Sequence, residues 1–190
     1  MVRPDMIEQE VKLQFPHVEA ARQAISAAGG RLVQSSRLIE DRLFDTSDAS
    51  LRQAGKTVRV RRDGGTTLIT FKGPLQPGVV KSREELETRV DSAAVIEGVL
   101  GGLGFHQVFK AQKYREEYEL DRAHVTIDQA PVGVFVEIEA TPERIEAVTR
   151  LLGRTPADYL LDSYPMLWRQ WCAAHNRPYD DMLFPETEVR

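Results

Sequence analysis

Apolar residues recur every three or four positions in four segments of the chain, the spacing that places them on one side of an α-helix. The segments are residues 17–28, 91–104, 141–153 and 162–175. Proline near the start and glycine after the end of several of them are typical helix boundaries. The apolar residues that we expect to be buried are Ala20, Ala21, Ala24, Ile25 and Ala28 in the first segment, Val95, Ile96, Val99, Leu100 and Leu103 in the second, Ile145, Val148, Leu151 and Leu152 in the third, and Met166, Leu167, Trp168 and Trp171 in the last. The pattern predicts four amphipathic helices.

The remaining segments alternate apolar and polar residues, the period of a β-strand with one buried face. Asp63-Gly64-Gly65 joins two of them and is the clearest hairpin signal in the chain. The predicted strands lie within residues 7–15, 36–46, 56–65, 66–73, 79–90, 112–120, 124–130 and 132–140. Eight strands and four helices in one chain predict an α+β fold.

Charged side chains share the face of these strands that lies opposite the apolar residues. The charged residues grouped in this way are Glu8, Glu10 and Lys12; Arg59 and Arg61; Lys72; Lys81, Arg83, Glu85, Glu87 and Arg89; Lys113, Arg115, Glu117 and Glu119; Asp128; and Glu137 and Glu139. The second predicted strand is ambiguous, because Asp41 and Asp45 share a face with Ile39 and Leu43.

The four helices restrict where these charges can point. Amphipathic helices need an apolar surface to pack on, and the strands offer one only on their apolar faces, so the charged faces point away from the helices. In a flat sheet the charged face would be solvated. Eight antiparallel strands are also enough to close into a barrel, and the charges would then line its lumen. Such a lumen is costly unless it is hydrated or holds a charged ligand.

The composition fits one domain of a soluble protein, with 190 residues, of which 42% are hydrophobic and 28% charged. The net charge of −4 gives no reason to expect nucleic acid or a membrane surface as a partner. Without an apolar signal region or a run of membrane-spanning length, the expected location is cytoplasmic. The single cysteine, Cys172, is expected to be a packed thiol, and the four histidines form no ligand pattern. Residues 1–176 are expected to form the domain and 177–190 a loose C-terminal tail.

The charged face has two kinds of group with complementary chemistry. Arginine and lysine bind phosphate oxygens, arginine through two parallel hydrogen bonds. Carboxylates one strand step apart, such as Glu8 with Glu10 and Glu137 with Glu139, suit hard divalent cations such as Mg²⁺ or Mn²⁺. Together they describe a site for polyphosphate and metal, but the pattern alone favours a mixed solvated face and leaves the site as the alternative.

The order of the motifs resembles the CYTH superfamily, the triphosphate tunnel metalloenzymes. Glu-x-Glu-x-Lys in the first strand is followed by LFDTSDASLRQAGKTVRVRR, TFKGP, SREELET, KYREEY, TIDQAPVGVFVEIE and DSYPMLW, which together extend over residues 7–168. The superfamily includes class IV adenylyl cyclases, thiamine triphosphatases, inorganic tripolyphosphatases and fungal RNA triphosphatases. The resemblance implies an eight-stranded antiparallel β-barrel around a central tunnel, with the helices packed outside.

The resemblance also implies roles for single residues. As metal ligands for Mg²⁺ or Mn²⁺ it implies Glu8, Glu10, Asp128, Glu137 and Glu139, with Glu85 and Glu87 at a possible second metal. As the triphosphate cradle it implies Lys12, Arg59, Arg61, Lys72, Arg83, Lys113 and Arg115. The catalytic set among these is Glu8, Glu10, Lys12, Arg59 and Arg61. Lys81, Arg89, Glu117 and Glu119 match the alternation but less clearly the motifs, and we expect them to form screening salt bridges.

A tunnel of this kind could serve two reactions on a triphosphate-containing small molecule. In hydrolysis of inorganic tripolyphosphate, thiamine triphosphate or a nucleoside triphosphate, water attacks the terminal phosphorus. In an adenylyl cyclase, the ribose 3′-hydroxyl of ATP attacks the α-phosphorus and pyrophosphate leaves. The stretch VRPDMI lacks the aromatic and glycine residues that precede Glu-x-Glu in well-studied cyclases, so hydrolysis is the expected reaction and cyclisation the alternative. A non-catalytic barrel that binds polyphosphate or a nucleotide is a further alternative, and the resemblance allows a homodimer.

Overall fold

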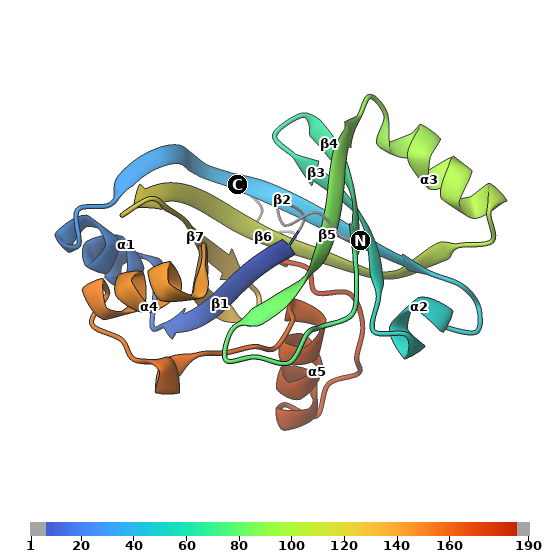
Figure 1. The fold of residues 1–190 in the computed structure, drawn as a ribbon. Coiled ribbons are helices and arrows are strands. Elements are labelled where there is room, and N and C mark those ends of the chain that lie inside the picture. Colours follow the sequence, from blue (N-terminus) through green and yellow to red (C-terminus); the bar gives the residue numbers. More distant parts are fainter. Residues whose placement is uncertain (1–6, 186–190) are drawn as a thin grey trace.

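Eight antiparallel strands close into a barrel in the computed structural model, which describes residues 7–185. The strands are β1 (Ile7–Phe15), β2 (Arg31–Asp45), β3 (Thr57–Asp63), β4 (Thr66–Lys72), β5 (Lys81–Val90), β6 (His106–Leu120), β7 (Ala123–Ala130) and β8 (Gly133–Glu139). Their order around the barrel is β1-β5-β4-β3-β2-β6-β7-β8 (Figure 1). The predicted α+β fold with a closed eight-stranded barrel is confirmed.

Pairing between strands that follow one another in the chain accounts for most of the strand order. β3 and β4 are joined by Gly64 and Gly65, whose φ angles of 52° and 91° fit a two-residue hairpin turn that needs positive φ at both positions. The longest strands, β2 and β6, pair with each other, and β1 closes the barrel by pairing with both β5 and β8. Because every strand has two neighbours, no open edge of the sheet remains in the barrel.

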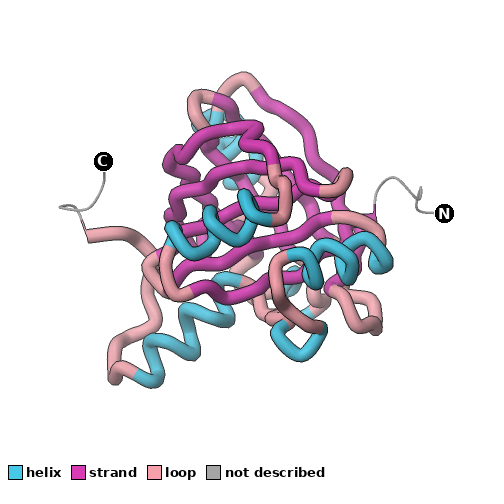
Figure 2. Tube along the Cα trace, turned by 90° about the vertical axis from the view of Figure 1, so that its left-hand side faces the viewer, coloured by secondary structure: helices cyan, strands magenta, loops and turns pink. Residues whose placement is uncertain are grey.

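The helices lie on the outside of the strands (Figure 2). They are α1 (Val18–Ala27), α2 (Ser50–Gln53), α3 (Ala93–Gly102), α4 (Pro142–Leu151) and α5 (Tyr164–Ala174), with a 3₁₀ turn at Pro156–Asp158. Four of them are the predicted helices. The short α2 was not predicted; its first turn is held by the Asp45 carboxylate, which accepts backbone N–H bonds from Leu51 at 2.9 Å and Arg52 at 3.0 Å. No helix within residues 7–185 is long and apolar enough to cross a membrane.

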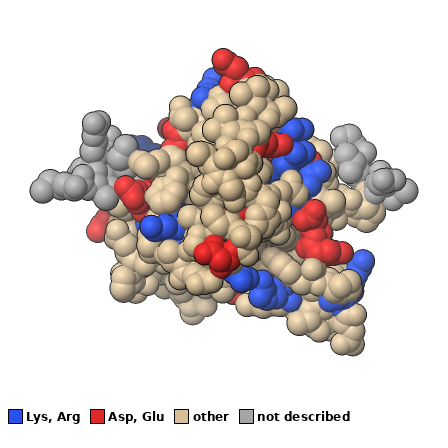
Figure 3. All heavy atoms as spheres, turned by 90° about the vertical axis from the view of Figure 1, so that its right-hand side faces the viewer, with Lys and Arg blue, Asp and Glu red and all other residues tan. Residues whose placement is uncertain are grey.

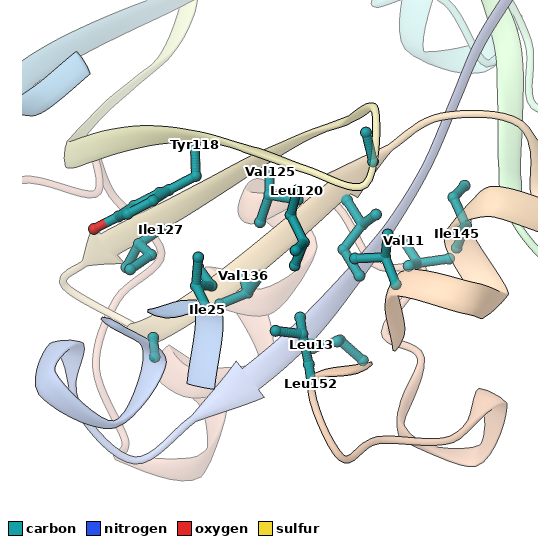
Figure 4. Close-up of a cluster of buried hydrophobic side chains, with 14 of the residues drawn as sticks. Val11, Leu13, Ile25, Tyr118, Leu120, Val125, Ile127, Val136, Ile145 and Leu152 are labelled. Carbon is teal, nitrogen blue, oxygen red and sulfur yellow. The ribbon is translucent and has the colours of Figure 1, made fainter. Parts of the chain in front are cut away.

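The main hydrophobic core lies between the barrel wall and two helices, α1 and α4 (Figure 4). β1, β7 and β8 contribute the outward-facing residues Val11, Leu13, Val125, Ile127, Val136 and Ile138, all of which are buried. Ile25 of α1 and Ile145 of α4 pack onto them. Each fully buried aliphatic side chain contributes roughly 1.5–3 kcal/mol. Because the apolar faces are used up in this outer core, the charged faces of the same strands are directed into the barrel.

The predicted apolar face of α3 was partly wrong. Val95, Val99 and Leu103 are 66%, 50% and 68% exposed, while Ile96 and Leu100 pack on the barrel. The helix is apolar on both sides, so its sequence pattern does not choose a face. Glu97 determines which face of α3 packs on the barrel, because its carboxylate accepts a hydrogen bond from Arg42 at 3.0 Å and lies 3.5 Å from Arg62.

The side of the molecule that carries α3 is largely uncharged, with charged side chains in small separate groups (Figure 3). Leu151 and Met166 are likewise exposed against expectation.

The segment after α5 is not a loose end, which corrects the sequence-based expectation for residues 181–184. Met182 is fully buried and pairs in parallel with Ala111 of β6. The Met182 N–H donates to the Lys110 carbonyl at 2.9 Å, and the Met182 carbonyl accepts from the Gln112 N–H at 2.9 Å. The cluster beneath it also contains Cys172, which is buried as expected. Met182 and Phe184 are buried while Leu183 between them is 38% exposed, so burial alternates along this segment as it does in a strand. Residues 186–190 of the expected tail lie outside the described part of the chain.

Candidate functional site

A cavity of about 730 Å³ occupies the inside of the barrel, and all eight strands contribute to its wall. Its charged lining includes the predicted residues Glu8, Glu10, Lys12, Arg59, Arg61, Lys72, Arg83, Glu85, Glu87, Lys113, Arg115, Glu137 and Glu139. Lys81 and Glu117 line it as well, whereas Arg89 and Glu119 do not. The alternation of charged residues therefore gathers side chains from distant parts of the sequence around one space.

Oppositely charged groups in the cavity hold one another. Lys12 Nζ lies 2.6 Å from Glu137 Oε1. Lys72 Nζ lies 2.7 Å from Glu8 Oε1 and 2.7 Å from Glu85 Oε2. Lys81 donates to Glu10. Residues that the resemblance assigns to metal, such as Glu137 and Glu8, are thus paired with residues that it assigns to phosphate, such as Lys12 and Lys72.

Asp128 lies behind the cavity wall, at the most buried point of the site. Its carboxylate is fully buried and accepts hydrogen bonds from Lys113 Nζ at 2.7 Å, Arg115 Nε at 2.6 Å and the Tyr164 hydroxyl at 2.8 Å. It stands outside the set of residues that line the cavity. In this arrangement Asp128 fixes the positions of two cradle cations, and its predicted role as a metal ligand would require those donors to move.

Tyr164 is a site residue that the sequence reasoning missed. It is the first residue of α5, where Ser163 is the N-cap and Pro165 fits the first turn. The ammonium groups of Lys12 and Lys113 lie 4.7 Å and 4.6 Å from the centre of its ring, within the range of a cation–π contact. The signal was present in the DSYPMLW motif, but strand alternation cannot show where a helix end lies relative to the barrel.

Asp41 is a second missed residue, and it resolves the ambiguity of the second strand. It faces the cavity and accepts two bonds from Arg61, Nε to Oδ1 at 2.7 Å and Nη2 to Oδ2 at 2.9 Å. β2 mixes charged and apolar residues on both faces: Leu43 lines the cavity beside Asp41, while Glu40 and Arg42 pair on the outside. Alternation therefore could not separate the two faces of this strand.

Burial and neighbouring charges shift the pKa values of several cavity groups. Burial alone would raise the pKa of Glu10, but Lys81, Lys12 and Lys72 lower it to about 2. Burial and the repulsion of Arg115 lower the pKa of Lys113 to about 8, against the attraction of Asp128. The pKa of Glu8 is raised by burial and by Glu10. The cavity thus holds carboxylates and ammonium groups whose charge states depend on one another.

One cradle residue has a donor that the ligand-free protein leaves unused. Arg59 Nε is buried and has no hydrogen-bond partner among residues 7–185, although Arg59 Nη2 donates to Thr70 at 3.1 Å and to Glu87 at 3.3 Å. A buried donor without an acceptor is uncommon in folded proteins and costs stability. An incoming phosphate oxygen is the kind of acceptor that would satisfy it.

The carboxylates fit a divalent cation in their chemistry, although their present positions do not form a ready site. Glu10 stands opposite Glu139 across β1 and β8, and Glu137 and Glu8 lie two residues away along the same strands. These side chains supply only oxygen ligands, which Mg²⁺ and Mn²⁺ prefer. Within the described part of the chain no three His, Cys, Asp or Glu side chains are clustered closely enough to hold a metal ion. A cation would enter by displacing ammonium groups from the carboxylates.

His124 lies at the rim of the cavity, where its ring nitrogens are 3.3 Å from Glu117 and 3.7 Å from Glu139. Contact with Glu139 and Glu117 raises the pKa of this ring. This position is that of a surface residue. It places the titratable ring of His124 beside Glu139, one of the predicted metal ligands.

The fold and the cavity define a β-barrel protein whose lumen is lined with side chains of both charges. The chain belongs to the CYTH domain family, whose sequence model matches residues 6–154. This confirms the resemblance on which the roles of the cavity residues were based. The match ends before α5, so Tyr164 and Met182 line the cavity from beyond the matched region.

The names or descriptions of three similar proteins mention two activities, adenylate cyclase and triphosphatase. The chain is 30% identical over 134 residues to adenylate cyclase CyaB of Aeromonas hydrophila, covering 69% of this chain and 67% of that protein. It is 26% identical over 148 residues to a provisionally assigned adenylate cyclase of Methanocaldococcus jannaschii, covering 77% and 84%. A Hippeastrum structure described as a cyclase with a dominant triphosphatase activity covers 96% of this chain and all of that one, at 16% identity and a TM-score of 0.62. The family relationship supports an enzyme and implies a divalent metal.

Proposed function

We propose that the protein is a triphosphatase that depends on Mg²⁺ or Mn²⁺ and hydrolyses the terminal phosphate of a small triphosphate in the barrel cavity. The observation that carries the proposal is the set of eight cations inside one cavity, namely Lys12, Arg59, Arg61, Lys72, Lys81, Arg83, Lys113 and Arg115. Phosphoryl transfer depends mainly on positioning and on neutralising charge, which such a set provides.

Five of the cations form two groups that differ in their surroundings. Lys12, Lys113 and Arg115 meet beside Tyr164 at the most buried part of the cavity. Arg59 lies nearer the partly exposed Glu87 and has its unused Nε. We assign the buried group to binding one end of the triphosphate and Arg59, with Arg61, to orienting the phosphoryl group that is transferred.

The carboxylates would hold the divalent cation. Glu8, Glu10, Glu137 and Glu139 are the proposed ligands, with Asp128 as a ligand only if its donors move, and Glu85 and Glu87 are proposed for a second cation. The metal supplies Lewis-acid charge neutralisation at the phosphate oxygens when it is bound. As the phosphate oxygens take over Lys12 and Lys72, Glu137 and Glu8 lose their partners and become available as ligands. Each of these ion pairs is thus a pair of binding groups.

An adenylyl cyclase is the second candidate. The names of the Aeromonas and Methanocaldococcus relatives favour it. Leu68 and Leu86 also lie on the cavity wall and offer apolar surface that a nucleoside could contact. Hydrolysis remains the proposal because the cavity supports triphosphate binding directly, whereas a ribose 3′-hydroxyl needs a nucleoside held in one orientation.

The test is an assay of the purified protein with tripolyphosphate, thiamine triphosphate and ATP, each with Mg²⁺ or Mn²⁺. Release of phosphate supports the proposed triphosphatase. Formation of cyclic AMP and pyrophosphate from ATP would instead show that the protein is an adenylyl cyclase. Binding without turnover would leave a non-catalytic barrel.

Arg59→Ala should lower the activity about 100-fold or more, the typical effect of removing one transition-state donor. Its melting temperature should remain close to wild type, because Asp41 and Glu85 keep closer partners in Arg61 and Lys72 when Arg59 is removed. The matched control is Arg62→Ala. Arg62 lies three residues further along β3 and faces outward towards Glu97, so the activity of this variant should stay near wild type. Equal activity in the two variants would contradict a role for Arg59.

A further inference from the structure

Thr126 of β7 carries a buried hydroxyl without a hydrogen-bond partner among residues 7–185. Thr126 is 2% exposed. The residue nevertheless belongs to the cavity wall. An unpaired buried hydroxyl costs about 1–3 kcal/mol, so a threonine at this position is harder to explain by folding alone than the isosteric valine.

The strand register places this hydroxyl between two carboxylates. Thr126 stands opposite Glu137 of β8 on one side and Glu117 of β6 on the other. Directly opposed residues of antiparallel strands have Cβ atoms about 4.5–5.5 Å apart, so the hydroxyl is within reach of either carboxylate after a side-chain rotation.

The two neighbours differ in what a ligand would do to them. Glu117 is held by Arg37 and approached by His124, neither of which belongs to the proposed phosphate cradle. Glu137 is held by Lys12 at 2.6 Å and by Arg115 at 2.5 Å, which do belong to it. When phosphate oxygens take these two cations, Glu137 is the carboxylate that loses its donors.

We propose that the Thr126 hydroxyl donates a hydrogen bond to Glu137 in the loaded cavity and orients this carboxylate towards the divalent cation. Thr126 is therefore a positioning residue that acts through Glu137. The inference rests on the proposed function, because it needs a ligand that draws Lys12 and Arg115 away. In this structure the two Glu137 oxygens are directed towards the stronger, charged donors Lys12 and Arg115 rather than towards the Thr126 hydroxyl.

The test compares wild type, Thr126→Val and Thr126→Ser in two measurements. The first is the melting temperature without ligands, where Thr126→Val should equal or exceed wild type because it removes an unpaired polar atom without changing the shape. The second is the Mg²⁺ concentration needed for half-maximal binding of tripolyphosphate, measured by calorimetry. We expect Thr126→Val to raise it about tenfold, as loss of a group that orients a metal ligand does, and Thr126→Ser to restore it.

The outcomes separate this inference from the proposed function. If wild type binds tripolyphosphate with Mg²⁺ and Thr126→Val needs the same Mg²⁺ concentration, the role of Thr126 is refuted while the triphosphate site stands. If Thr126→Val melts well below wild type and Thr126→Ser does not recover Mg²⁺ dependence, the residue is structural. If wild type itself does not bind tripolyphosphate at any Mg²⁺ concentration, the proposed function fails and the inference with it.

Discussion

Lys113 shows how single residues of the cavity combine stability with ligand binding. Its ammonium group is buried beside Arg115, and these two effects bring its pKa to about 8, below the ordinary 10.5. The folded state therefore loses this proton at lower pH than the unfolded state does. This group makes folding more favourable as the pH rises from about 8 towards 10.5, because the cost of the buried charge is relieved. An anion in the cavity needs the opposite, a protonated Lys113.

We therefore expect the affinity for tripolyphosphate to be steady below about pH 8 and to fall above it, by up to about tenfold for each pH unit. Calorimetric titration between pH 7 and 9.5 measures the effect. Lys113→Arg is the matched control, because an arginine keeps its charge over this range. Lys81, whose pKa burial also lowers, is present in both proteins. A decline of the same size in wild type and Lys113→Arg would show that Lys113 is not its source.

The residues of the site that could be predicted are those that carry a charge on a strand with one apolar face. Glu8, Lys12 and Glu137 were found in this way, because alternation fixes their face once the helices have claimed the other. Thr126 lies on the same face as Asp128, but a neutral hydroxyl carries no signal in a search for charges. Asp41 was left open because β2 has charged residues on both faces.

The helices of the protein illustrate the same limit at the scale of elements. Their positions along the chain were predicted well, since caps, prolines and glycines act within a few residues. The buried face was predicted for α1, where Ile25 stands on one apolar stripe. It failed for α3, where the choice depends on Glu97 meeting Arg42 and Arg62 across a large distance in sequence. Contacts of that kind cannot be inferred from the local pattern.

The pairing of the segment after α5 with β6 leads to a prediction for this element. Met182→Ala should lower the free energy of unfolding by about 3 kcal/mol, because Met182 is fully buried in a cluster with Trp168 and Cys172. Met166→Ala is the matched control, since Met166 is 51% exposed on α5 and should change stability by less than about 0.5 kcal/mol. Urea denaturation of both variants measures the difference. Equal stabilities would mean that the segment is as loose as its sequence suggested.

At the scale of the whole molecule, the barrel encloses opposite charges that satisfy one another before any ligand arrives. A cation that binds alone would leave ammonium groups such as Lys12 without partners, and a phosphate that binds alone would do the same to carboxylates such as Glu137. Buried charges without partners are expensive. The two ligands should therefore bind much more favourably together than separately.

We expect Mg²⁺ to raise the affinity for tripolyphosphate at least about tenfold, and tripolyphosphate to raise the affinity for Mg²⁺ by the same factor, since such coupling is reciprocal. Binding of Mg²⁺ to tripolyphosphate in solution has to be measured in parallel and subtracted. Calorimetric titration of each ligand with and without the other gives both factors. Independent binding of the two would contradict the exchange of partners.

The pairwise balance inside the barrel also sets rules for redesigning it. Removing one member of a buried ion pair costs about 3–5 kcal/mol, whereas replacing both members by well-packed apolar residues is often neutral or stabilising. Lys81 with Glu10 should thus be exchanged as a couple when the barrel is adapted to a different guest, whereas Lys72 is shared by Glu8 and Glu85 and has to be changed together with both. A library that varies these positions one at a time would consist mainly of damaged proteins, while one that varies each such group together would sample new interiors on an intact scaffold.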